Sequence, residues 1–90
     1  MTHHCHAIGC EVPVDPVFLM CPPHWGRVPL PLRRAVWNHY REGQCDDKQP
    51  SSEWMIAAER AIVAVAVAEK KLTPAQGQAR VEREIALFAP

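Results

Sequence analysis

The 90-residue sequence lacks a charge excess of either sign, because Lys and Arg together number 10 and Asp and Glu also number 10. A formal net charge of zero argues against a protein that binds nucleic acid by bulk charge. Aromatic residues are scarce at 7%, and small residues (12 Ala and 9 Val) are prominent among the apolar 48%. That apolar share is too high for a disordered tail. We therefore expect one small domain, residues 1–90. Its core of small side chains needs an additional source of stability.

Long apolar runs and targeting segments are absent as well. The longest apolar run, residues 61–68, is far shorter than the roughly 20 residues of a transmembrane helix. The first residues lack the basic start and apolar stretch of a secretory signal peptide. We accordingly expect no membrane partner and a cytoplasmic location, where thiols stay reduced. In that compartment the four cysteines indicate metal binding rather than disulfides.

A Cys/His pattern near the start of the chain has the spacing of a zinc site. It reads C-x4-C-x10-C-x2-H and comprises Cys5, Cys10, Cys21 and His24. Zinc prefers four tetrahedral ligands, and three cysteines with one histidine are a common structural set. Each closely spaced pair would supply two ligands to the ion, and the loop between the pairs would close the site. We predict a structural Zn²⁺ at these residues, in a loop-rich segment, residues 1–27, called the knuckle below.

Three alternatives to this site remain open at the level of the sequence. His3, His4 or His6 can replace His24 as the fourth ligand, because all three lie next to or near Cys5. The thiols can also be reduced and buried without a metal. A catalytic zinc would keep an open coordination position and need a nearby base, and four available protein ligands argue against it. We therefore predict no catalytic residues and no enzymatic activity.

Residues 28–90 are predicted to form three helices, which makes the fold mainly α. The first spans about residues 29–41 and ends before a glycine suited to a C-terminal cap. Its apolar face consists of Leu32, Val36 and Tyr40, which are spaced four residues apart.

The second predicted helix begins at a cap on Ser51 or Ser52, runs to about Leu72 and is apolar all round its middle. Such a helix lies either at the centre of the fold or between two copies, so we expect a monomer or a homodimer. The third helix starts at Thr73, which is followed by Pro and, three residues after the cap, by Gln. It extends to about Phe88 and can pack more loosely than the other two predicted helices.

Aromatic and basic residues collect in the knuckle and the first helix. Arg33, Trp37 and Arg41 are spaced four residues apart and would share one face of that helix, beside its apolar face. Trp and Arg are the residues that most often anchor protein interfaces. We predict that Trp25, Arg33, Trp37 and Arg41 bind a protein partner.

Two other functions fit the same part of the sequence. The first is a nucleic-acid-binding zinc protein, since arginines bind phosphates and aromatic rings stack on bases. Its contacts would come from Arg27, Arg33, Arg34 and Arg41. The second is a small metal-dependent nuclease, which would need an incomplete metal shell and a free histidine such as His6 or His39.

Several blocks of sequence carry a resemblance to a known family. They include Cys5-His6 with Cys10, the run Leu19-Met20-Cys21-Pro22-Pro23-His24-Trp25, and Ala35-Val36-Trp37 with Tyr40-Arg41. Over about residues 5–68 the chain resembles small, zinc-finger-like Cys/His proteins encoded by phages and prophages of proteobacteria, a family without an assigned activity. The resemblance implies a protein in the cytoplasm of a bacterial host cell. Small phage proteins of this type often block a host protein, including host defence complexes such as CRISPR machinery.

Overall fold

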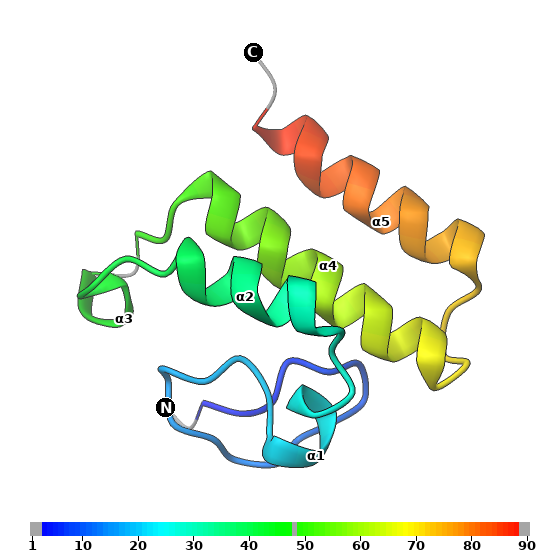
Figure 1. Ribbon diagram of the computed structural model, residues 1–90, viewed down its shortest axis with the longest axis horizontal. Coiled ribbons are helices and arrows are strands. Elements are labelled where there is room, and N and C mark those ends of the chain that lie inside the picture. The colour runs from blue at the N-terminus through cyan, green and yellow to red at the C-terminus, as the bar shows by residue number, and fades with distance from the viewer. Residues whose placement is uncertain (1–2, 48, 89–90) are drawn as a thin grey trace.

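Helices make up most of the regular structure in the computed structural model, which describes residues 3–47 and 49–88, with only the backbone of Asp46. Residues 1–2, 48 and 89–90 of the predicted domain lie outside this description. The helices are α1 (Pro22–Trp25), α2 (Leu30–Asn38), α3 (Gln44–Asp47), α4 (Ser52–Ala68) and α5 (Pro74–Leu87). The described residues contain no strand, and an isolated antiparallel bridge between His4 and Pro13 joins two parts of the knuckle. The chain is therefore mainly helical, with a loop-rich N-terminal part (Figure 1).

The predicted three-helix arrangement is incomplete, because the one-turn helices α1 and α3 accompany α2, α4 and α5. α3 forms between the first and second predicted helices, where the sequence predicted no helix. α2 also ends earlier than predicted, at Asn38. Its continuation is replaced by a side-chain contact: the backbone N–H of Arg41 donates to Oε1 of the buried Gln44 at 2.8 Å. A local amide side chain therefore takes the donor that a longer helix would use.

The central helix α4 packs against α2 on one side and α5 on the other (Figure 1). It begins at the predicted cap, where Ser51 Oγ accepts a hydrogen bond from the N–H of Trp54 at 3.1 Å. Its buried residues are all small: Ala57, Ala58, Ala61, Val65 and Ala66. The chain itself thus supplies two neighbours for the helix that the sequence marked as apolar all round.

α4 ends at Ala68 and not at about Leu72, because Lys70 adopts a left-handed conformation with φ of 61°. The N–H of Lys70 donates to Val67 O at 3.1 Å, and the N–H of Lys71 donates to Ala66 O at 2.8 Å. This pair of bonds is the Schellman motif, which satisfies the last carbonyls of a helix. After this turn, Glu69 and Lys71 contact the knuckle.

α5 begins with the predicted capping box, in which Thr73 and Gln76 bond to each other's backbone N–H. Gly77 lies where α5 approaches α4 most closely. A Cβ at this position would lie 2.6 Å from Cγ1 of Val63 and 3.1 Å from Cγ2 of Val67. Gly77 is also the residue that α5 buries within the described part of the chain, so the closest approach of the two helices depends on a residue without a side chain.

The knuckle lies along one side of the helical layer, away from the C-terminal end of α5 (Figure 1). Its buried residues join Val28, Val36 and the small residues of α4 in a single core. The knuckle contributes Cys5, Ala7, Leu19, Met20 and Cys21 to that core. Two of the predicted metal ligands are therefore part of the packed interior.

Candidate metal centre

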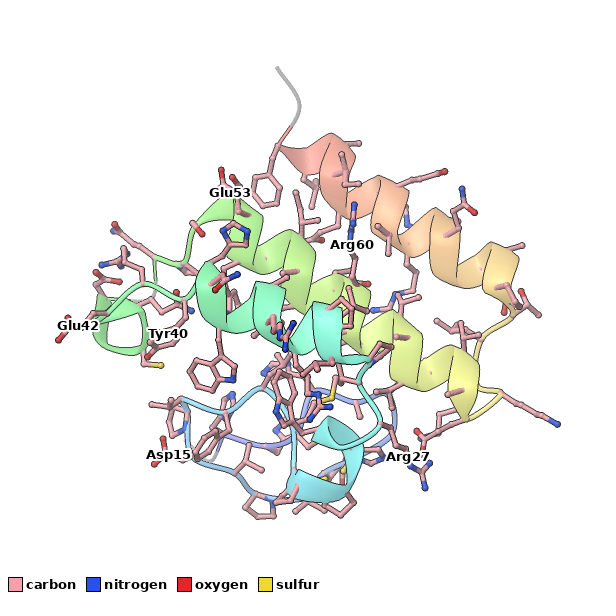
Figure 2. All side chains as sticks on the ribbon, viewed as in Figure 1. Asp15, Arg27, Tyr40, Glu42, Glu53 and Arg60 are labelled. Carbon is pink, nitrogen blue, oxygen red and sulfur yellow. The ribbon has the colours of Figure 1, made fainter. Side chains whose placement is uncertain are left out.

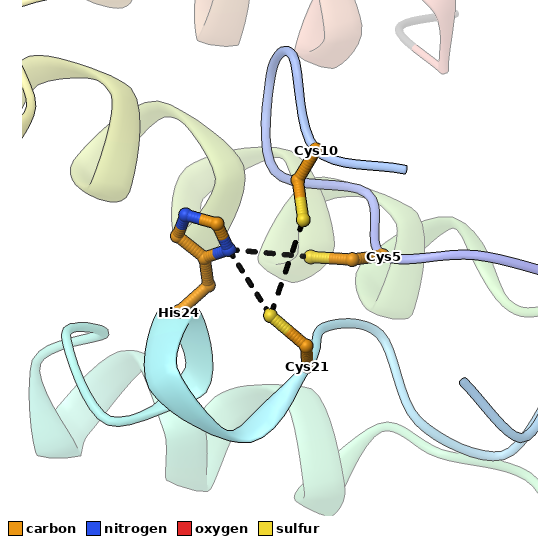
Figure 3. Close-up of side chains that lie close together, drawn as sticks. All are labelled: Cys5, Cys10, Cys21 and His24. Carbon is orange, nitrogen blue, oxygen red and sulfur yellow. Dashed lines mark hydrogen bonds between the residues drawn. The ribbon is translucent and has the colours of Figure 1, made fainter. Parts of the chain in front are cut away.

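Four side chains of the knuckle point toward one another (Figure 3). Cys5, Cys10, Cys21 and His24 each offer one ligand atom, and these atoms all lie within 4.8 Å of one another. Nδ1 of His24 is 3.2 Å from Sγ of Cys21 and 3.6 Å from Sγ of Cys5. Sγ of Cys10 is 4.0 Å from Sγ of Cys21. These four residues can therefore bind a metal ion.

The dimensions fit a tetrahedral ion. Ordinary zinc bond lengths place two sulfur ligands about 3.8 Å apart and a sulfur and a nitrogen ligand about 3.6 Å apart. The contacts of 3.2–4.0 Å in the cluster bracket these values. The cysteines are free thiols, and the 4.0 Å between Cys10 and Cys21 is about twice the length of a disulfide bond.

The first pair of ligands lies on a tight turn. Gly9 adopts φ of 82°, which residues with a side chain rarely adopt. The N–H of Cys10 donates to Ala7 O at 3.0 Å and closes the turn. The N–H of Ala7 donates to Sγ of Cys5 at 3.4 Å, a bond that favours the thiolate form. The turn thus brings the two sulfurs of a C-x4-C segment to one point.

The second pair lies at the start of α1. Cys21 is the residue before the helix, and His24 follows three positions later, so both side chains lie on one face of a single turn. Pro22 and Pro23 occupy the first two helical positions, where a backbone N–H has no partner within the helix. The N–H of Trp25 donates to Cys21 O at 2.9 Å and completes the turn.

Burial and hydrogen bonding shift the pKa values of the thiols in opposite directions. Cys5 is 1% exposed, and burial raises the pKa of its thiol to about 11. Cys10 is more accessible, and a hydrogen bond from the backbone of Val12 lowers the pKa of its thiol. A bound cation takes the place of the thiol protons, so metal binding and ligand deprotonation are coupled.

A carboxylate from the end of α4 contacts the outer side of His24. Nε2 of His24 lies 3.3 Å from Oε2 of Glu69, while Nδ1 faces the sulfurs. Metal-binding histidines commonly donate their second N–H to a carboxylate, which fixes the orientation of the ring and increases its basicity. The arrangement of His24 and Glu69 matches this pattern.

Glu69 is held in place by two cations. Its Oε2 accepts a hydrogen bond from Arg27 at 2.8 Å, and Oε1 lies 3.4 Å from Nζ of Lys71. Burial alone would raise the pKa of Glu69, but Lys71, His24 and Arg27 lower it overall, so the carboxylate is ionised at neutral pH. Nζ of Lys71 also donates to the backbone O of Ile8 at 2.6 Å. Figure 2 shows Arg27 extending near the C-terminal end of α4.

Of the histidines that the sequence left open as fourth ligand, His24 is the one that lies beside the sulfurs. His24 joins the three sulfurs, and the cluster found among the described residues does not include His3, His4 or His6. The role of Glu69 was not predicted, because no local pattern connects it with His24, which lies far earlier in the chain.

The four predicted binding residues do not form one surface in the structure. Trp25 and Trp37 line one groove, whereas Arg33 and Arg41 are not among the described residues that line it. Arg41 lies beyond the end of α2, and its guanidinium donates to Oδ2 of Asp47 at 2.6 Å. The shared helical face predicted for Arg33, Trp37 and Arg41 is wrong, because α2 stops before it reaches Arg41.

The groove lies between the knuckle and α2 and has a volume of about 500 Å³. All three tryptophans of the chain line it, together with Phe18 and Tyr40. The rings of Phe18 and Trp37 meet edge to face with centroids 6.5 Å apart, and these residues are 52% and 43% exposed. Asp15 is the one charged residue in the described lining. In Figure 2 it lies on the same side of the molecule as Tyr40.

The chain matches no protein-family model, no curated protein and no solved structure. Among the described residues, no helix is both long and apolar enough to cross a membrane.

Proposed function

We propose that the chain is a non-enzymatic, zinc-stabilised helical protein that binds another protein through the groove between the knuckle and α2. The observation that carries this proposal is the groove itself. Exposed aromatic rings in a concave apolar surface are the features that anchor protein interfaces. Trp25 and Trp37, two of the predicted binding residues, lie in it.

The donor set supports a structural role for zinc. Three thiolates and one imidazole complete a tetrahedron without water, whereas a catalytic zinc keeps a position for substrate. The sulfurs of Cys5 and Cys21 belong to buried residues, and the carboxylate of Glu69 contacts Nε2 of His24, the ring nitrogen that faces away from the cluster. In a core built of Ala and Val, the ion would supply the stability that bulky side chains provide elsewhere.

The lining of the groove defines the chemistry of its occupant. It offers a carboxylate, Asp15, and no basic side chain among the described residues. A complementary protein segment therefore carries a large apolar side chain next to a Lys or Arg. A volume of about 500 Å³ lies within the range of pockets that enclose such groups. The resemblance to phage proteins makes a host protein, such as a component of a CRISPR defence complex, the partner that we propose.

The test is a selection of displayed random peptides on the zinc-loaded protein. We expect enriched peptides to pair an aromatic or large aliphatic residue with a nearby basic residue. Trp37→Ala should weaken their binding at least tenfold, because a central aromatic anchor is lost. Leu30→Ala is the matched control, since Leu30 lies on the same helix, is 47% exposed and does not line the groove. Its peptide affinity should stay within twofold of the wild type.

A second variant, Asp15→Asn, examines the charge. It should weaken peptides that contain a basic residue and leave neutral ones unchanged. Equal binding by the wild type and Trp37→Ala would remove the groove as the binding surface. Binding of an oligonucleotide with an affinity that falls steeply as salt rises would support the nucleic-acid alternative instead.

A further inference from the structure

Two imidazoles outside the cysteine cluster face each other in the knuckle. Nε2 of His3 lies 3.1 Å from Nε2 of His6, and the ring centroids are 5.1 Å apart with the planes tilted by 53°. We propose that His3 and His6 form a second, solvent-accessible site for a divalent transition-metal ion such as Ni²⁺ or Zn²⁺.

The separation of the two nitrogens has the value that a shared ion requires. With metal–nitrogen bonds of about 2.0–2.1 Å, two ligands at about 90° to 110° around one ion lie about 2.8–3.4 Å apart. The observed 3.1 Å falls inside this interval. Imidazole nitrogens suit Zn²⁺, Ni²⁺ and Cu²⁺, whereas Mg²⁺ and Ca²⁺ prefer oxygen ligands.

The surroundings of His3 direct a lone pair toward His6. Nδ1 of His3 lies 3.4 Å from the backbone O of Val14. A carbonyl only accepts, so Nδ1 carries the proton and Nε2 has its lone pair free for a partner. Without a metal, Nε2 of His6 donates a hydrogen bond to that lone pair. With a metal, both Nε2 atoms are ligands.

The backbone holds both imidazoles in position. The N–H of Val14 donates to His3 O at 3.1 Å, and the N–H of His6 donates to Leu19 O at 3.0 Å. His6 is exposed, so water can fill the remaining coordination positions. With two protein ligands, this site binds its ion more weakly than the cluster of three cysteines and His24.

His4 does not complete the pair. Its ring centroid lies 6.3 Å from that of His6, and the three histidines do not form a metal-binding group among the described residues. His4 therefore offers a matched control, since it is a histidine of the same segment outside the proposed site.

In the test, Ni²⁺ alone is added to protein that already holds one equivalent of zinc. Equilibrium dialysis followed by elemental analysis then measures how much of each metal the protein binds. The wild type and His4→Gln should bind one equivalent of Ni²⁺ and keep their zinc. His3→Gln and His6→Gln should each lower the Ni²⁺ affinity at least tenfold and keep one zinc, which also reports that the knuckle is folded.

A measurement on the unaltered protein accompanies the variants. Paramagnetic Ni²⁺ should broaden the imidazole NMR signals of His3 and His6 before those of His39, which lies outside the knuckle. Equal Ni²⁺ uptake by His3→Gln, His6→Gln and the wild type would overturn the proposal, as would uptake that releases one zinc for each Ni²⁺ bound. Neither result would affect the groove.

Discussion

Nε2 of His24 lies 3.3 Å from Oε2 of Glu69, so one imidazole faces three sulfurs on one side and the end of α4 on the other. The cysteines belong to loops and a one-turn helix, whereas Glu69 follows the longest helix of the chain. The contact joins these two parts of the fold through a candidate metal ligand. Changes at the cluster should therefore be measurable in the helices, and changes at Glu69 should be measurable in metal affinity.

Removal of the metal should abolish cooperative unfolding. Cys21→Ala is expected to lose the zinc and to melt without a sharp transition, because structural zinc binding supplies folding free energy directly. Elemental analysis and circular dichroism during heating would measure both effects. Cys45→Ser is the control, since Cys45 contacts Tyr40 Oη at 3.3 Å and lies outside the cluster. A metal-free wild type with an unchanged melting curve would contradict the structural role of the ion.

Glu69→Ala should lower zinc affinity by about 10- to 100-fold, the usual effect of removing the carboxylate behind a ligand histidine. Competition with a chromophoric chelator would measure the affinity. Arg27→Ala is the matched control, because it removes a partner of Glu69 and leaves the contact with His24 in place. Its zinc affinity should change less than about threefold, since an exposed ion pair is worth little. Equal losses in the two variants would mean that Glu69 acts through general packing and not through His24.

Gly77→Ala should destabilise the protein by about 1–2 kcal/mol. The new methyl would lie 2.6 Å from Cγ1 of Val63, and this overpacking outweighs the better helix propensity of Ala. Urea unfolding at saturating zinc would measure the free energy. Combining Gly77→Ala with Val63→Ala removes the clash, so the double variant should be more stable than the sum of the single effects. Strict additivity would show that α4 and α5 are farther apart at this point.

Lys70→Gly should stabilise the protein by about 0.5–1 kcal/mol. The residue has φ of 61° in the turn after α4, a conformation that costs an L residue more than it costs glycine. Lys70→Ala is the control for the lost charge, because Ala retains the unfavourable conformation and should not stabilise. Urea unfolding of the two variants side by side would separate these effects. A destabilised Lys70→Gly protein would contradict the left-handed turn.

The parts of the fold that the sequence predicted correctly depend on groups close together in the chain. The caps at Ser51 and Thr73 each involve a backbone N–H three residues later. The four candidate metal ligands, which the structure brings together, form two short-spaced pairs, and the chemistry of zinc restricts how such pairs combine. His24 could be favoured over the three N-terminal histidines for the same reason, since a two-residue spacer from Cys21 fits one helical turn.

The parts that could not be predicted depend on contacts between distant segments or on single backbone angles. α2 ends early because Gln44 bonds to the N–H of Arg41, and α4 ends early because Lys70 adopts a positive φ. Hydrophobic periodicity contains no information on either event. The contact of Glu69 with His24 joins residues that become neighbours only after the knuckle packs on α4.

The groove has one wall from the knuckle and another from α2, so it exists only while the knuckle is ordered. If zinc orders the knuckle, the concentration of available zinc sets how many molecules present a complete binding surface. By thermodynamic reciprocity, a partner seated in the groove would in turn slow the loss of the ion. The protein would then hold its metal most tightly in the complex, and chelators would attack the free form first.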